Sequence, residues 1–160
     1  MRNIAVFAVL ILFTLFAALY DRRSFRIPNQ VVFPGMLAGL LLSDSLPELG
    51  LKLLALAALY LFGMTRLMEA GDLKLWMMVS CIIGFTDSCL IILFANLFLI
   101  LKIYVEKPVE TACLLKTVFV QLYSLKRMAI AKEKGYAFAP YVFCVTFVYV
   151  LIQIVRLMFL

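Results

Sequence analysis

The sequence predicts an all-α fold, a polytopic transmembrane bundle of about six spans that forms one domain over residues 1–160. Hydrophobic residues make up 66% of the chain and charged residues 15%, whereas soluble domains have about 45–50% and about 25%. The apolar residues come in long uncharged runs, as membrane helices require. Lys and Arg concentrate in alternate connecting segments, which is the pattern of cytoplasmic loops.

Six apolar runs define the predicted spans, and they cover residues 4–20, 27–43, 53–65, 75–86, 88–101 and 138–155. The first ends at the charges of Asp21 and Arg22, and Pro28 suits the first helical turn of the second. Several runs are shorter than the ~20 residues of a full crossing. Lys52 and Arg66 can extend the third by reaching towards the membrane interfaces.

The fourth and fifth runs could instead form one long helix over residues 75–101, with Asp87 inside it. With six spans and the N-terminus outside, only Arg2, Lys52 and Arg156 of the 15 Lys and Arg residues fall outside. A fused helix would move the basic residues of segment 102–137 to the outer face, against the positive-inside rule. The charge distribution therefore favours a break near Gly84, Thr86 and Asp87. The sixth run, after this loop, then returns to the outside.

The composition argues against several kinds of site. The chain has no histidine, so Ser–His and Cys–His nucleophile pairs and His-containing zinc sites are excluded. Its four cysteines form no C-x-x-C pair and suit small core residues. The net charge of +6 fits cytoplasmic loops better than a nucleic-acid surface. We therefore expect no metal, no cofactor and no nucleic-acid partner, and contact with membrane lipid.

The segment 102–137 carries apolar residues at helical spacing, with basic residues off that face. This pattern predicts an amphipathic helix at the cytoplasmic interface. The helix could contact the membrane or a substrate, and the sequence leaves both open.

Two aspartates stand at membrane boundaries, where carboxylates are costly unless they are used. Asp21 follows the first span and Asp72 precedes the fourth, so the predicted topology places both at the cytoplasmic face. Two close carboxyls share a proton, and one can then accept a proton from water while the other donates to a peptide carbonyl. Simpler roles are an N-cap for Asp72 and an ion pair between Asp21 and Arg22, Arg23 or Arg26. Gly71 would permit tight backbone geometry before Asp72.

The predicted helix ends also suggest which aspartate holds the shared proton. Asp21 ends a helix, where the dipole disfavours negative charge, whereas Asp72 begins one. We therefore expect the proton on Asp21, although the neighbouring arginines oppose this.

Together these stretches resemble the prepilin peptidase family, the membrane aspartyl proteases with a G-x-G-D motif. "DRRSFRIPN" places Asp21 before Ile27, Pro28 and Asn29, as in that family, and "EAGDLKL" supplies Gly71, Asp72 and Lys74. "YAFAPYVF", with Phe138 and Pro140, is similar to the tract that opens the family's last helix. The resemblance spans residues 1 to about 155.

The resemblance implies a peptidase in the cell membrane that removes the leader of type IV pilin-like precursors at the cytoplasmic face. Its catalytic residues would be Asp21 and Asp72. The supporting or substrate-binding residues would be Gly71, Lys74, Arg26, Pro28, Asn29 and Glu69. Alternatives are a catalytically inactive assembly protein of a pilus or secretion system, and a small proton-coupled transporter.

The chain departs from the family pattern in two ways. The paired-cysteine segment of the long, N-methylating members is lacking, which predicts a short, peptidase-only form. Glu69 replaces the first glycine of G-x-G-D and adds a third carboxylate near the pair. Glu69 could form an ion pair with Lys74 or Arg66. If it does not, its charge should raise the pKa values of the pair.

Overall fold

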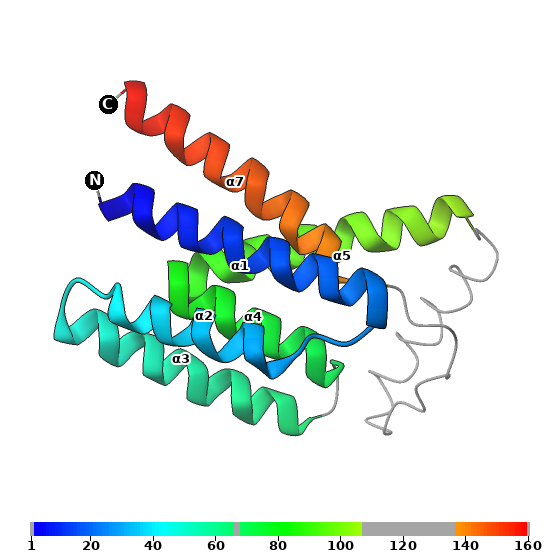
Figure 1. Cartoon of the computed structure of the whole chain (residues 1–160), viewed down its shortest axis with the longest axis horizontal. Helices are drawn as coiled ribbons and strands as arrows, with labels where there is room; N and C mark the ends of the chain where they lie inside the picture. The colour runs from blue at the N-terminus through cyan, green and yellow to red at the C-terminus, as the bar shows by residue number, and fades with distance from the viewer. Residues whose placement is uncertain (1, 66–67, 107–136, 160) are drawn as a thin grey trace, which may run out of the picture.

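The computed structural model describes residues 2–65, 68–106 and 137–159, and these residues form helices without any strand. The helices in chain order are α1 (Arg2–Ser24), α2 (Asn29–Leu41), α3 (Leu46–Met64), α4 (Ala70–Ile83), α5 (Phe85–Glu106) and α7 (Ala139–Phe159). They pack as a bundle with both termini towards the same end (Figure 1). The predicted all-α class is confirmed.

Four of these helices are long and apolar enough to cross a membrane, namely α1 (from Ile4), α3, α5 and α7. The other two, α2 and α4, have 13 and 14 residues. At 1.5 Å per residue each extends only about 20 Å, against a hydrocarbon core of roughly 30 Å. The predicted number of about six spans is therefore higher than helix length supports, although a described helix covers most of each of the six apolar runs.

Helix α4 lies at the centre of the bundle, because it packs against α1, α2, α3 and α5. Its buried residues lie on all sides of the helix: Leu75, Met78, Val79, Ser80, Cys81 and Ile82. A helix that is apolar all round is suited to such a position. The first turn of α4, which holds Asp72, is thereby fixed relative to four other helices.

Helices α2 and α4 run parallel and approach closely through two glycines of α2. A Cβ added at Gly35 would lie 2.6 Å from the sulfur of Met78, and one at Gly39 would lie 2.6 Å from the backbone of Cys81. Gly35 and Gly39 are four residues apart, the small-residue spacing that lets membrane helices pack backbone to backbone. The two helices therefore begin at the same end of the bundle.

The junction between α4 and α5 confirms the predicted break. Helix α4 ends at Ile83, Gly84 has φ +94°, and α5 begins at Phe85. A residue with a side chain rarely adopts this backbone conformation, so the glycine permits the change of direction.

Lys52 behaves differently from the expectation that it reaches towards the membrane interface. Its side chain is buried, donates a hydrogen bond to the Gly39 carbonyl at 3.1 Å, and pairs with Glu48 at 3.0 Å. Gly39 lies in the last turn of α2, where carbonyls lack partners within the helix and cations are favoured. Lys52 therefore holds α3 against the end of α2.

Candidate active site

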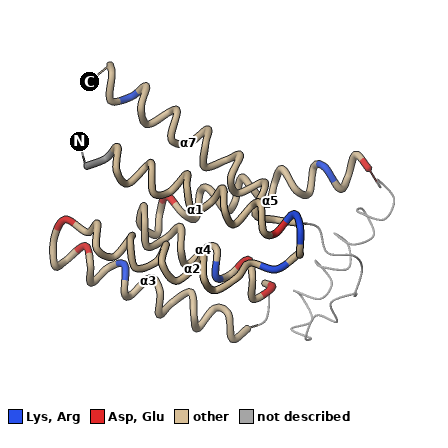
Figure 2. Tube along the Cα trace, viewed as in Figure 1, with Lys and Arg blue, Asp and Glu red and all other residues tan. Residues whose placement is uncertain are grey.

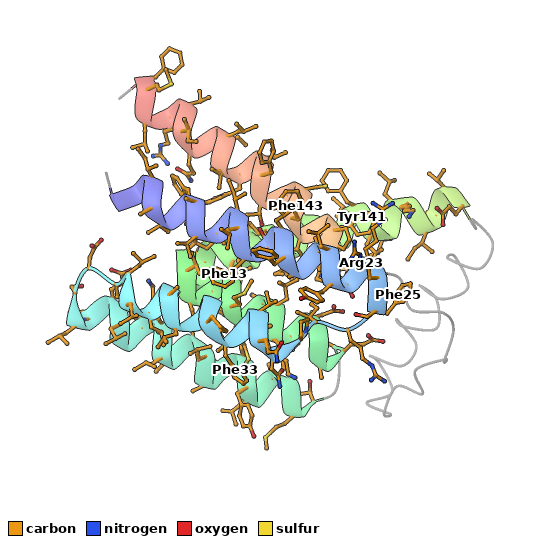
Figure 3. All side chains as sticks on the ribbon, in the orientation of Figure 1. Phe13, Arg23, Phe25, Phe33, Tyr141 and Phe143 are labelled. Carbon is orange, nitrogen blue, oxygen red and sulfur yellow. The ribbon has the colours of Figure 1, made fainter. Side chains whose placement is uncertain are left out.

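Asp21 lies in the last turn of α1 and is almost fully buried, with 6% of its surface exposed. The chain turns immediately afterwards, where Phe25 adopts φ 51° and its amide donates to the Asp21 carbonyl at 2.9 Å. In Figure 3 the labelled Arg23 and Phe25 mark this end of α1, and Tyr141 marks the beginning of α7.

The Asp21 carboxylate is bound by the beginning of α7. The backbone N–H of Ala139 donates to Asp21 Oδ2 at 2.9 Å, and this hydrogen bond is buried. It connects residues 118 positions apart in the chain. Among the described residues, the ion pair that we considered between Asp21 and Arg22, Arg23 or Arg26 does not form.

Asp72 lies inside the first turn of α4 rather than at its N-cap. Glu69 is the residue before the first helical position, and Asp72 is the third residue of the helix. Gly71 is helical and a Cβ added to it would meet nothing within 4 Å, so the tight backbone geometry expected there is not needed. Gly71 instead leaves open space beside Asp72.

Both aspartates line one cavity of about 460 Å³ between the end of α1 and the beginning of α4. The predicted residues Arg26, Glu69, Gly71 and Lys74 line it too, whereas Pro28 and Asn29 do not. Figure 2 shows charged residues at the end of α1, in the turn that leads into α2 and at the beginning of α4. Phe25, Ile27 and Ala70 complete the lining, and these three are not among the site residues that the sequence predicts.

The pKa of Asp72 is raised to about 7, mainly because burial penalises the charged carboxylate. The negative charges of Glu69 and Asp21 raise it further. Asp72 belongs to the short helix α4, outside the four helices of spanning length. This shift opposes our expectation that the shared proton lies on Asp21, because it makes Asp72 the carboxyl that retains a proton near neutral pH.

Lys74 bonds to Asn29 instead of pairing with Glu69. Its ammonium donates to Asn29 Oδ1 at 2.9 Å and so joins the beginnings of α4 and α2. Pro28 lies at the N-cap of α2, one residue before the position that we predicted for it. Within the described part of the chain Glu69 has no ion pair, while Arg66 lies outside that part.

The described residues contain no group of three His, Cys, Asp or Glu side chains that could hold a metal ion. Most of segment 102–137, with its predicted amphipathic helix, lies outside the described residues; positions 102–106 belong to α5. The contribution of Ala139 was missed because it comes from the backbone. Pro140 beside it was the available signal, because proline often marks the beginning of a helix.

The family model of the type IV leader peptidase family matches residues 8–105, more than half of the chain and a range that includes both aspartates. The comparisons with curated proteins and with solved structures gave no match. On the extent of the family match, the chain belongs to the type IV leader peptidase family.

Proposed function

We propose that this protein is an aspartic endopeptidase of the cell membrane that removes the leader peptide of type IV pilin-like precursors. Asp21 and Asp72 are its catalytic pair, and residues 1–160 act as one membrane-embedded peptidase domain. The observation that carries the proposal is that carboxylates from two distant segments line the same cavity. The family of the chain, whose members are leader peptidases, supports it.

The two carboxyls suit peptide hydrolysis because they favour different protonation states. A carboxyl with a pKa of about 7, as for Asp72, can hold a proton at neutral pH and donate it to a peptide carbonyl. A second, ionised carboxyl can accept a proton from the attacking water. The reaction needs no group from outside the chain other than water.

The remaining lining residues have supporting roles in this proposal. Lys74 and Asn29 hold the beginnings of α4 and α2 together. Gly71 leaves room for the substrate backbone beside Asp72. Arg26 adds positive charge at the cavity mouth, and Pro28 sets the direction of the chain into α2.

The active site faces the cytoplasm in this proposal. Arg22, Arg23, Arg26 and Lys74 all lie at this end of the bundle, as the positive-inside rule requires of a cytoplasmic end. In a variant without native cysteines, Ser24→Cys should resist an impermeant thiol reagent in intact cells. A cysteine that replaces Leu46, the exposed first residue of α3, should react, because the chain enters α3 beyond the far end of α2. The reverse labelling would place the site outside.

Leader removal during co-expression with a pilin-like precursor from the same organism tests the activity. We expect cleavage with the unaltered protein and with Asp44→Asn, an exposed aspartate remote from the cavity. We expect none with Asp21→Asn or Asp72→Asn. If no variant cleaves, including the unaltered protein, the result favours an inactive assembly protein or a transporter.

A further inference from the structure

The beginning of α7 is built so that one backbone amide is available to Asp21. The first four amides of a helix have no partner within it. The N–H groups of Tyr141 and Val142 bond to the Phe138 carbonyl at 3.0 and 3.3 Å, and Pro140 has no N–H. Among residues 139–142, the amide of Ala139 is therefore the one left without a carbonyl of the helix, and it donates to Asp21.

This contact acts on the charge of Asp21 as well as on its position. An amide N–H can only donate, so it stabilises the ionised carboxylate over the neutral acid. The positive end of the α7 dipole acts in the same direction. The hydrogen bond is buried, and Phe138 and Ala139 are only 3% and 1% exposed, which limits the access of water to the amide.

Asp72 has the opposite surroundings. It stands near Glu69 and Asp21, and both charges oppose its ionisation. The cations that line the cavity are Arg26 and Lys74, and Lys74 is bonded to Asn29. The first titratable residue of α7, Tyr141, does not line the cavity and lies against Lys102 of α5.

We infer that Asp21 is the base that activates water, that Asp72 is the acid, and that the Ala139 amide is the positioning group that fixes Asp21 in its role. This inference rests on the proposed function and assigns the parts that the two carboxyls play in it. Oδ2 of Asp21 is held by the amide, and Asp21 still lines the cavity.

The proton transfers balance over one cycle. Asp21 takes a proton from water, the water oxygen bonds to the peptide carbon, and the carbonyl oxygen takes the proton of Asp72. In the second step a hydroxyl of the gem-diol returns a proton to Asp72 and the C–N bond breaks. The leaving nitrogen takes the proton held by Asp21. The products are a carboxylic acid and an amine, and both aspartates regain their starting states.

The Ala139→Pro variant replaces the amide hydrogen with a ring methylene that faces Asp21, so it removes the hydrogen bond and moves the carboxylate away from the nitrogen. Proline is well tolerated at the first position of a helix, which Ala139 occupies. The matched control, Ala139→Gly, keeps the N–H. We expect Ala139→Pro to lower kcat about ten- to a hundredfold, the effect of one hydrogen bond to a charged group. The acid limb of its pH–rate profile should move to higher pH, because the charged base loses a donor. Ala139→Gly should keep the original profile.

An unchanged pH–rate profile in Ala139→Pro, at any activity, would overturn the inference. If that variant does not insert or fold, infrared titration of the carboxyl C=O band in Asp21→Asn and Asp72→Asn decides. The band that titrates near neutral pH should persist in Asp21→Asn and vanish in Asp72→Asn. The opposite result refutes the assignment. The infrared titration can be measured without any cleavage. If the unaltered protein does not cleave, the proposed function is rejected, while the titration still tests which aspartate holds the proton.

Discussion

Asp21 and Asp72 differ in their surroundings: the carboxylate of Asp21 accepts a hydrogen bond, whereas that of Asp72 lies near negative charges. Asp21 is the more buried of the two, yet it receives a hydrogen bond from the beginning of a helix that lies 118 residues further along the chain. Asp72 is partly buried beside two negative charges, and its pKa is raised to about 7. Burial alone therefore does not describe the two carboxyls, because only the more buried one, Asp21, receives a hydrogen bond from a helix N-terminus.

The difference should be visible in how stability depends on pH. The pKa of Asp72 in the folded protein, about 7, lies above its ordinary value of 3.8. The stability that this shift contributes is complete below about pH 4 and is lost as the pH rises through about 7. The free energy of unfolding in detergent can be measured for Asp72→Asn and the unaltered protein from pH 4 to 8. Relative to the unaltered protein, that of Asp72→Asn should rise over this range by on the order of a few kcal/mol. A difference independent of pH would mean that Asp72 titrates normally.

The second expectation concerns the loss of each carboxyl at fixed pH. Asp21→Ala leaves the Ala139 amide buried without its acceptor, which should lower the free energy of unfolding by about 1–3 kcal/mol. Asp72→Ala breaks no such contact and removes a charge beside Glu69. Denaturant unfolding at pH 8 should therefore show a loss for Asp21→Ala only. Equal losses of unfolding free energy in the two variants would contradict the difference between the surroundings of Asp21 and Asp72.

Much of this comparison could not be read from the sequence. The apolar runs gave the helices, and Gly84 correctly marked the break between α4 and α5. Both aspartates were predicted to meet because local patterns and the charges of the loops place them at one face. The Ala139 contact was not predicted: Pro140 signals the beginning of a helix, but the sequence does not show that the acceptor of the amide beside it lies in a segment 118 residues away.

The raised pKa of Asp72 opposes the expectation that the shared proton lies on Asp21. That expectation weighed the dipole of α1 against the neighbouring arginines and left out the beginning of α7, whose amide donates to Asp21. The close parallel packing of α2 on α4 was also missed, although the Gly35 and Gly39 spacing was a usable signal. By contrast, the alternative in which Glu69 stays unpaired and raises the pKa of the pair agrees with the effect of Glu69 on Asp72.

Gly71 allows the open side of Asp72 to be tested without disturbing the fold. A Cβ at this position meets nothing within 4 Å, and Gly71 is one of the residues that line the cavity. Gly71→Ala should preserve stability or raise it by up to about 1 kcal/mol, the helix propensity of alanine over glycine. We expect KM for the precursor to rise several-fold.

The matched control is Gly50→Ala on α3, where an added Cβ also meets nothing within 4 Å and no cavity residue is near. It should leave KM unchanged. A Gly71→Ala enzyme with unaltered kinetics would mean that the substrate does not approach Asp72 from this side.

The smallest expected effect is that of Glu69. Glu69→Gln removes one of the charges that raise the pKa of Asp72, so the alkaline limb of the pH–rate profile should move towards acid by less than about one pH unit. Activity should persist, and Glu69→Gly, which restores the family motif, should behave alike. Glu106→Gln, a glutamate of α5 paired with Lys102, serves as the control. Complete loss of cleavage in Glu69→Gln would give Glu69 a direct role that the two-aspartate mechanism lacks.

The most direct test of the central claim is single-turnover cleavage by the purified protein in lipid vesicles, measured for Asp21→Asn, Asp72→Asn and the double variant. If the two aspartates act as one catalytic unit, each single variant should lose at least about a hundredfold in rate. The double variant should then be no slower than either single one. Substantial cleavage by one single variant, or a double variant that loses the product of the two single losses, would contradict the claim that Asp21 and Asp72 work as a pair.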